Sequence, residues 1–376
     1  MVSGRRKVGI AGAVAGVGAA GIGAAVGLRR LAVGRVRLRP DPDADEPFGE
    51  LRGKPLTVEA SDGLDLHVEI DGPDDAPLTI VFSHGYALTQ DTWHYQRRDL
   101  RHSPGRPRLV FWDQRSHGRS GRSVPTSATI DQTGDDLYAV LRATVSPGAP
   151  VVLVGHSMGG MSIMALALNH PELFEASTDS PRVVGVALVN TSCGKLTEMT
   201  LGLPLVLAKV LRPLAPGTLR GLGRRADIVD RVRGLGADVA FVVTKRMAFA
   251  DKYVSPTVVD FLEQMIRATP IDVIAEFYPE LIAHDKAAAL ETIGRVPAVV
   301  MAGGEDRLTP AEHGRSIADA LPGAEYVEVG EAGHVLPLEY PGVVTGGVRR
   351  LLDRVGEGRA EHEEHEEHQE REERSA

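Results

Sequence analysis

The strongest candidate for a reactive residue in this 376-residue chain is a serine between two glycines, in the motif Gly155-x-Ser157-x-Gly159. An apolar, β-branched run at 150–154 precedes them, and an apolar run with helical spacing follows at 161–170. In the context of a buried strand, a tight turn and a helix, such a serine can act as a nucleophile at the carboxyl edge of a sheet. The glycines relieve the crowding of strand against helix in this turn. The pattern therefore predicts nucleophilic catalysis by Ser157.

A serine hydroxyl is a weak nucleophile until a base accepts its proton, and the base needs a group that orients it. His334 directly follows the last predicted strand, at 326–329, and is the expected base. Asp306 and Glu305 both follow the predicted strand at 296–302. We assign Asp306 as the acceptor of the other imidazole N–H, with Glu305 as its rival.

Strand and helix patterns alternate along most of the chain. A hairpin is predicted at 56–70, and further strands at 78–82, 108–112, 150–154, 183–190, 296–302 and 326–329. Helices are predicted at 91–100, at 131–144 with Asp131 as the start signal, and at 161–170, 311–320 and 343–355. This alternation predicts the α/β fold class: a mostly parallel sheet flanked by helices, with ligands gathering beyond the carboxyl ends of the strands.

The alternation is interrupted at about 191–286, where the chain has apolar helical patterns and no convincing buried strand. Ser255 and Pro256 are of the types that cap and open a helix. We interpret this stretch as a helical lid over the carboxyl edge of the sheet. The alternative is a second domain unconnected to the site. The many Leu, Val, Phe and Met side chains in the insertion favour an apolar acyl or alcohol group in the substrate.

Five pieces of sequence together resemble the α/β-hydrolase fold family over about residues 55 to 355. They are His84-Gly85, Asp113-x-Arg115-x-His117-Gly118-x-Ser120, Gly155-His-Ser-Met-Gly159, Gly303-Gly-x-Asp306-x-x-x-Pro310 and Gly333-His334. The resemblance is to the serine-nucleophile branch, which contains esterases, lipases and perhydrolases. It implies that Asp306 rather than Glu305 is the acid. It also implies that the backbone N–H groups of Tyr86 and Met158 form the oxyanion hole.

The resemblance implies a serine hydrolase that acts on an ester or another activated acyl compound through an acyl-enzyme, with no cofactor and no metal. The serine argues against epoxide hydrolases and haloalkane dehalogenases of the same fold, which need a carboxylate as nucleophile. Cofactor-free haloperoxidases (perhydrolases), carbon–carbon bond hydrolases and lipases share these residues and remain alternatives. A catalytically silent binding protein on the same fold is an alternative of another class.

Several polar residues in these motifs are expected to have structural roles. We predict that His84 and His117 make structural hydrogen bonds and that Asp113 organises its loop. Ser116 stands where the family commonly has glycine. Cys193, the only cysteine, excludes an internal disulfide and a multi-cysteine metal site, and is expected to be a small buried residue.

The net charge of −9 conceals a basic N-terminal segment. Residues 1–39 carry eight Lys and Arg and no acid, and they enclose an apolar run of 21 residues at 8–28. That length suits a membrane span, so membrane association through residues 8–28 is expected. A secretory signal of the twin-arginine type and a soluble Gly/Ala-rich arm are the alternatives. Because the positive charge lies beside an apolar run, no nucleic-acid partner is expected.

Two further segments lie outside the predicted hydrolase domain of residues 55–356. Residues 40–54 are rich in Pro and acid and are interpreted as a linker. Residues 357–376 hold nine Glu and three Arg, with histidines at 362, 365 and 368. Dense like charge without apolar residues predicts a disordered, solvated tail, although these histidines could collect a metal ion adventitiously.

Overall fold

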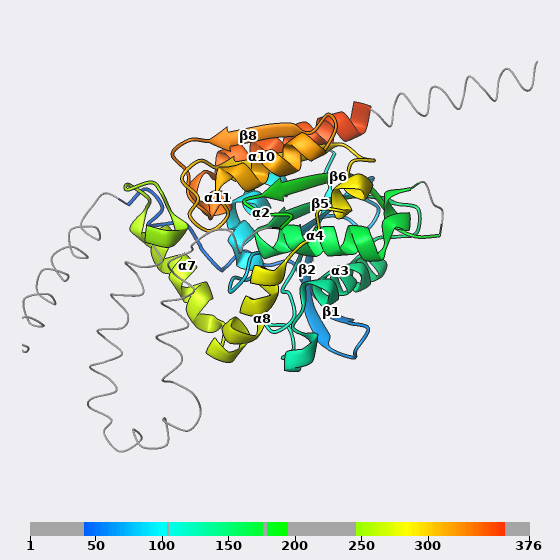
Figure 1. Cartoon of the computed structure of the whole chain (residues 1–376), viewed down its shortest axis with the longest axis horizontal. Helices are drawn as coiled ribbons and strands as arrows, with labels where there is room; N and C mark the ends of the chain where they lie inside the picture. The colour runs from blue at the N-terminus through cyan, green and yellow to red at the C-terminus, as the bar shows by residue number, and fades with distance from the viewer. Residues whose placement is uncertain (1–40, 104, 176–178, 195–245, 358–376) are drawn as a thin grey trace, which may run out of the picture.

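A computed structural model of the chain describes residues 41–103, 105–175, 179–194 and 246–357. Within them, eight strands form one sheet in the order β1-β2-β4-β3-β5-β6-β7-β8 (Figure 1). The strands are β1 Lys54–Glu59, β2 Asp65–Asp71, β3 Thr79–Ser83, β4 Arg108–Trp112, β5 Pro150–His156, β6 Arg182–Val189, β7 Ala298–Gly303 and β8 Glu325–Val329. The pairs from β4 to β8 are parallel, and β2 is antiparallel to β1 and β4. The prediction of a mostly parallel sheet is confirmed.

Helices cover both faces of this sheet. They are the 3-10 helices η1 Gln90–Trp93, η2 Pro125–Ser127 and η3 Pro171–Phe174, and α2 His94–Leu100, α3 Ile130–Thr144, α4 Met158–Asn169, α7 Pro256–Ala268, α8 Ile271–Ala283, α9 Ala289–Ile293, α10 Ala311–Ala320 and α11 Leu336–Glu339. Residues 341–357 are also helical. The helix predicted at 131–144 starts one residue earlier, because Thr129 rather than Asp131 caps it: the Thr129 hydroxyl accepts from the backbone N–H of Gln132 at 3.1 Å.

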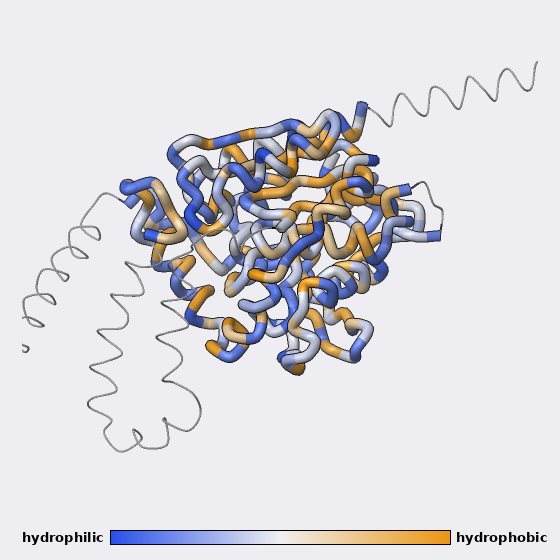
Figure 2. Tube along the Cα trace, viewed as in Figure 1, coloured by the Kyte–Doolittle hydropathy of each residue, from blue (hydrophilic) through white to orange (hydrophobic). Residues whose placement is uncertain are grey.

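The apolar strands divide their side chains between two cores. In β5, Val151 and Leu153 join the core with α3, α4, α9 and α10, whereas Val152 and Val154 join the core with α2 and the helix at 341–357. Strands covered on both faces must be apolar at every position, which explains the continuous β-branched runs in the sequence. In Figure 2 the strands at the centre of the domain are mostly hydrophobic, whereas many hydrophilic residues lie in the outer loops and helices.

The described part of the predicted insertion consists of residues 191–194 and 246–286, and residues 195–245 lie outside the description. It contains α7 and α8, which follow one another along the chain, with α7 at the left of the view and α8 below α4 (Figure 1). As predicted, Pro256 opens α7, and the Ser255 hydroxyl caps it by accepting from the N–H of Val258. Phe261 of α7 packs with residues from α2 and α11, and Phe277 of α8 packs with residues from α3 and α4.

The stretch 41–53, within the predicted linker, packs against the hydrolase domain. The Phe48 ring stacks on Phe261 of α7 at 4.6 Å between ring centroids and meets the edge of Tyr95 of α2 at 5.6 Å. The Asp41 carboxylate accepts hydrogen bonds from the N–H and hydroxyl of Thr257, at 3.1 and 2.7 Å, at the first turn of α7. This stretch therefore joins α2 to the insertion, a contact that its Pro- and acid-rich composition does not indicate.

Two predictions fall on residues that the structure does not describe. They are the apolar run at 8–28 and the acidic tail from residue 358 onward. Among the helices of the described ranges, none combines the length and the apolar character that a bilayer crossing requires.

Candidate active site

Ser157 occupies a backbone conformation that side chains other than glycine rarely adopt, with φ 51° and ψ −118° between β5 and α4. The two flanking glycines make this turn sterically feasible. A Cβ atom on Gly159 would lie 2.1 Å from the carbonyl oxygen of Ser83 at the end of β3. A Cβ atom on Gly155 would lie 2.6 Å from the carbonyl oxygen of Gly159. The sharp strand-to-helix turn predicted from the motif is therefore present, with Ser157 at its apex.

The structure brings together the serine, the histidine and the aspartate that the sequence singles out. His334 Nε2 lies 3.0 Å from Ser157 Oγ, and His334 Nδ1 lies 2.8 Å from Asp306 Oδ2. All three residues are buried, with 9% or less of their surface exposed. Glu305, the rival acid, is exposed. Three loops at the carboxyl ends of β5, β7 and β8 thus supply one continuous chain of hydrogen-bonding groups.

Several hydrogen-bond donors surround the Asp306 carboxylate and favour its ionised form. Oδ1 accepts from the backbone N–H groups of Leu308 and Thr309, at 2.8 and 3.0 Å, and Oδ2 accepts from the Thr309 hydroxyl at 2.8 Å. Burial acts to raise the pKa of Asp306, but His334 and these donors outweigh it and hold the pKa below its ordinary value. An anionic Asp306 accepts the Nδ1–H of His334, which leaves Nε2 of a neutral imidazole free to accept the Ser157 proton.

The loop at 84–86 lies directly against the serine. A Cβ atom on Gly85 would lie 3.3 Å from Ser157 Cβ and 2.8 Å from Nδ1 of His156. No hydrogen bond among the described residues engages the backbone N–H of Tyr86 or that of Met158, the first residue of α4. The start of a helix also carries a partial positive charge. These two N–H groups, named from the family resemblance, are thus unpaired donors on residues beside Ser157.

His84 and His117 hold this loop in place through both ring nitrogens. His84 Nε2 accepts from the N–H of Gln114 at 2.9 Å, and its Nδ1 donates to the carbonyl oxygen of Gly85 at 2.7 Å. His117 Nε2 accepts from the N–H of Ala87 at 3.1 Å, and its Nδ1 donates to the carbonyl oxygen of Arg115 at 2.9 Å. Burial lowers the pKa of His84 to about 3 and that of His117 to about 4, so both rings are neutral. Their place in the structure is that of structural hydrogen-bonding residues.

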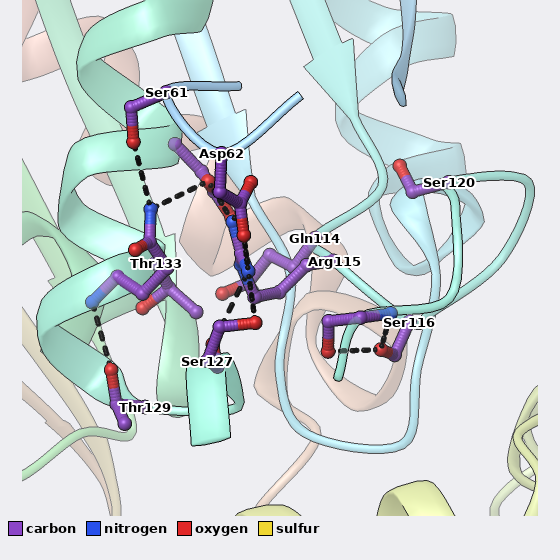
Figure 3. Close-up of polar contacts among 12 residues, drawn as sticks. Ser61, Asp62, Gln114, Arg115, Ser116, Ser120, Ser127, Thr129 and Thr133 are labelled. Carbon is purple, nitrogen blue, oxygen red and sulfur yellow. Dashed lines mark hydrogen bonds and ion pairs between the residues drawn. The ribbon is translucent and has the colours of Figure 1, made fainter. Parts of the chain in front are cut away.

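The loop after β4 is anchored by a buried arginine. The Arg115 guanidinium pairs with Asp136 of α3 at 2.6 Å and with Asp62 of the β1–β2 turn at 2.9 Å, and it donates to the Ser127 hydroxyl at 2.9 Å. Figure 3 shows Arg115 between Asp62 and Ser127. Removing one partner of such a buried pair costs about 3–5 kcal/mol. The arginine of the family motif therefore positions the loop from outside the site.

Asp113 and Ser116 shape the same loop. Asp113 accepts from the backbone N–H groups of Gln90 and Arg119, at 2.8 and 3.0 Å, as expected of a loop-organising residue, and burial raises its pKa to about 6. Ser116, where the family commonly has glycine, adopts a left-handed φ of 63°. Its hydroxyl lies 2.8 Å from that of Ser123 and accepts the Ser123 N–H at 3.0 Å, contacts that stabilise this conformation (Figure 3 shows Ser116).

The insertion contacts the loop at 84–86 directly. The Tyr86 hydroxyl donates to the backbone carbonyl of Ile274 in α8. Tyr86 and Met158 pack with Val273 and Phe277 of the same helix in one apolar cluster. The surroundings of the two candidate oxyanion donors are therefore apolar on the α8 side.

Asn190 and Cys193 lie outside the set of predicted site residues. Asn190, treated in the sequence only as the end of a strand, donates from Nδ2 to Asp306 Oδ2 at 2.6 Å. Cys193, expected to be buried, is half-buried and packs against the core to which α4 and α9 contribute. Across the described ranges, no group of three or more His, Cys, Asp or Glu side chains is arranged to hold a metal ion.

The family model described as "Alpha/beta hydrolase family" matches residues 80–345, and the chain belongs to this family. It is 32% identical over 167 residues to an sn-1-specific diacylglycerol lipase of Mus musculus, a match that covers 44% of this chain and 48% of that protein. It is 28% identical over 160 residues to a monoacylglycerol lipase of Mycolicibacterium smegmatis, covering 41% and 52%. The chain thus spans about half the length of these curated relatives.

Solved structures show the same architecture. An enol-lactonase from Burkholderia xenovorans superposes with a TM-score of 0.60 at 25% identity, covering 79% of this chain and 100% of that one. An esterase from Rhodococcus superposes with a TM-score of 0.63 at 18% identity, covering 80% and 99%, which is a likeness of fold alone.

The buried histidines predict how stability depends on pH. Burial lowers the pKa of His84, His117 and His156 to between about 3 and 4, whereas the unfolded chain protonates them near pH 6.5. Below that pH the unfolded state binds more protons, so the free energy of unfolding should fall as pH decreases from 6.5 toward 4. Asp113 opposes this below about pH 6, because its folded pKa is raised.

In the variant His117→Gln, the free energy of unfolding should depend less steeply on pH, by about 1.4 kcal/mol per pH unit, because one proton fewer binds on unfolding. Chemical denaturation from pH 4 to 7 measures this slope. His102→Gln, at an exposed histidine, is the control for the histidine-to-glutamine change itself. An unaltered slope in His117→Gln would contradict the assignment of a neutral, buried imidazole.

Proposed function

We propose that the protein is a serine hydrolase that cleaves an ester or another activated acyl compound through an acyl-enzyme. The observation that carries this proposal is the chain of contacts from Ser157 Oγ through His334 to Asp306, at 3.0 and 2.8 Å. Ser157 is the nucleophile, His334 the general base and acid, and Asp306 the group that orients and stabilises the imidazolium. Family membership and the names of the relatives, which include lipases and a lactonase, support the same reaction class.

The geometry suits a two-step reaction. His334 Nε2 takes the Ser157 proton as Oγ attacks the substrate carbonyl, and the N–H groups of Tyr86 and Met158 stabilise the negative oxygen of the tetrahedral intermediate. His334 then donates that proton to the leaving alcohol, which departs and leaves an acyl group on Ser157. Water attacks this acyl-enzyme with His334 again as base. His334 then returns the proton taken from water to Ser157 Oγ as the bond between Oγ and the acyl carbon breaks, which releases the acid and restores the free serine.

The substrate of this proposal has an apolar acyl or alcohol part. Val273 and Phe277 of α8 join Met158 and Met161 of α4 and the ring of Tyr86 in one apolar cluster beside the proposed oxyanion hole. An aliphatic chain placed against these side chains would gain free energy by leaving water. Perhydrolysis and carbon–carbon bond cleavage use the same three residues and are the rival reactions.

The protein is also proposed to associate with a membrane through residues 8–28, with a cleaved secretory signal as the rival. A run of 21 apolar residues covers roughly 31 Å as a helix, the thickness of a hydrocarbon core. The eight flanking Lys and Arg add attraction to anionic lipid.

Substitutions within the proposed triad should have unequal costs. Ser157→Ala and His334→Ala should each lower kcat by several powers of ten, and the double variant should lose little more, because the residues act as a unit. Asp306→Asn should cost less, and Glu305→Gln, on the exposed neighbour, is the matched control expected to keep wild-type kinetics. Steady-state ester hydrolysis measures all five variants. A silent Asp306→Asn with an inactive Glu305→Gln would show that the acid is misassigned.

Hydrolysis of p-nitrophenyl esters of increasing acyl length should report the apolar part of the site. Each buried methylene contributes about 0.8 kcal/mol, so kcat/KM should rise up to about fourfold per carbon until the site is filled. The leaving group is constant through the series, which isolates the acyl chain. Activity confined to acetate would refute an apolar acyl site.

Fractionation tests the membrane proposal. The full chain should sediment with membranes and stay there in a high-salt wash, whereas a chain lacking residues 1–39 should remain in the supernatant with the same kcat/KM. Because Asp41 and Phe48 are retained, the shorter chain keeps its packing on α7. Full-length protein in the supernatant at low salt would rule out the anchor, and a shortened chain in the medium would favour the signal.

A further inference from the structure

We propose that Asn190 is a positioning residue of the active site, one that holds the proposed acid and the loop of the proposed base in a single arrangement. The side chain is buried, with 2% of the residue exposed. Its Nδ2 group donates two hydrogen bonds, to Asp306 Oδ2 at 2.6 Å and to the carbonyl oxygen of Gly333 at 3.1 Å. This inference rests on the proposed function, since it assigns a role at the same site.

One amide thus joins two loops that the chain otherwise keeps apart. Asp306 follows β7, Gly333 precedes His334 after β8, and Asn190 follows β6. The Asn190 amide reaches the same carboxylate oxygen that accepts the Nδ1–H of His334 at 2.8 Å. A shift of the amide would therefore move Asp306 relative to the imidazole that it orients.

Hydrogen bonds also hold the backbone of Asn190 in one conformation. Its φ of 44° lies in the left-handed region, where asparagine is among the better tolerated residues. Its N–H donates to the carbonyl of Met301 in β7 at 2.8 Å. Its own carbonyl oxygen lies 2.9 Å from the Thr309 hydroxyl, whose one proton it shares with Asp306 Oδ2. The side-chain Oδ1 is buried without a hydrogen-bond partner among the described residues. A buried acceptor without a hydrogen-bond partner destabilises the folded state. The two hydrogen bonds of Nδ2 must therefore account for the placement of this side chain.

The contact between Asn190 and Asp306 joins a neutral amide donor to an ionised carboxylate. Nδ2 carries no net charge, so it stabilises the ionised carboxylate without competing for a proton. Replacement by an acid would place two carboxylates within hydrogen-bond distance, and such a pair retains a proton because both cannot ionise together. That proton would lie at the oxygen that the imidazole N–H needs.

The other titratable groups near Asn190 and Asp306 are unchanged by a substitution of Asn190. His156 donates from Nε2 to the carbonyl of His334 at 2.8 Å, and burial lowers the pKa of His156 to about 3, so it stays neutral. Glu339 accepts the N–H of Gly333 at 2.6 Å from the other side of the loop, and Glu305 and Arg307 are exposed. A difference in pH profile between wild type and an Asn190 variant therefore reports the Asn190 contact.

Two substitutions of Asn190 in the full-length protein test the proposal. Asn190→Gly keeps the left-handed backbone but removes the donor, and it should lower kcat about tenfold to a hundredfold with KM within about twofold, because the amide does not touch the substrate. Asn190→Asp keeps the shape of the side chain. It should move the acid limb of the kcat/KM profile upward by about one pH unit or more, since the acid pair holds its proton to higher pH.

Ser192→Ala is the matched control. Ser192 is buried two residues further along, and its hydroxyl bonds the Gly194 backbone and His313, away from the three proposed catalytic residues. This control should lose comparable stability with an unchanged pH profile. Titration of active sites with a fluorophosphonate normalises every rate to the folded fraction, so a variant that merely unfolds is recognised.

A fall in kcat at constant KM together with the upward shift in Asn190→Asp supports the proposal. Wild-type kcat and profile in both variants would overturn it, as would losses that track the folded fraction with an unmoved acid limb. A wild-type protein that hydrolyses no ester and takes up no fluorophosphonate would overturn the proposed function and this inference with it. Inactive Ser157→Ala beside fully active Asn190 variants would overturn this inference alone.

Discussion

The site depends on one tight contact, the approach of the first turn of α4 to the end of β3. Gly159 lies so close to the carbonyl of Ser83 that no other residue fits there, and this contact holds Ser157 in its left-handed turn. With α4 in that position, the N–H of Met158 and the loop at 84–86 lie beside the serine. In this turn Ser157 Oγ lies 3.0 Å from His334 Nε2, and His334 Nδ1 lies 2.8 Å from Asp306 Oδ2.

A second constraint concerns charge. Each buried imidazole around the site, in His84, His117 and His156, is neutral because burial lowers its pKa. The Asp306 carboxylate is the buried group that four surrounding donors, besides the imidazole, keep ionised. The imidazole of His334 therefore faces one anion on its Nδ1 side and the serine hydroxyl on its Nε2 side, which is the polarity that general base catalysis requires.

Much of this arrangement could be predicted from the sequence because its causes are local. A β-branched run, two glycines and a helical run specify the turn at Ser157, and the positions of Asp306 and His334 just after strands place them at one edge of a parallel sheet. Asn190 could not be found in the same way, since an asparagine at a strand end resembles any turn residue, and its contact with Asp306 joins residues 116 positions apart. The packing of Phe48 on α7 depends on distant partners in the same manner.

The most direct test of Ser157 as the nucleophile is to find the residue that a fluorophosphonate modifies. Full-length protein incubated with a fluorophosphonate and digested for mass spectrometry should carry one stoichiometric adduct, on the peptide containing Ser157. The adduct should be absent from Ser157→Ala and should form far more slowly in His334→Ala, because a serine without its base is a poor nucleophile. A stoichiometric adduct on another serine, or continued ester hydrolysis by Ser157→Ala, would contradict the account.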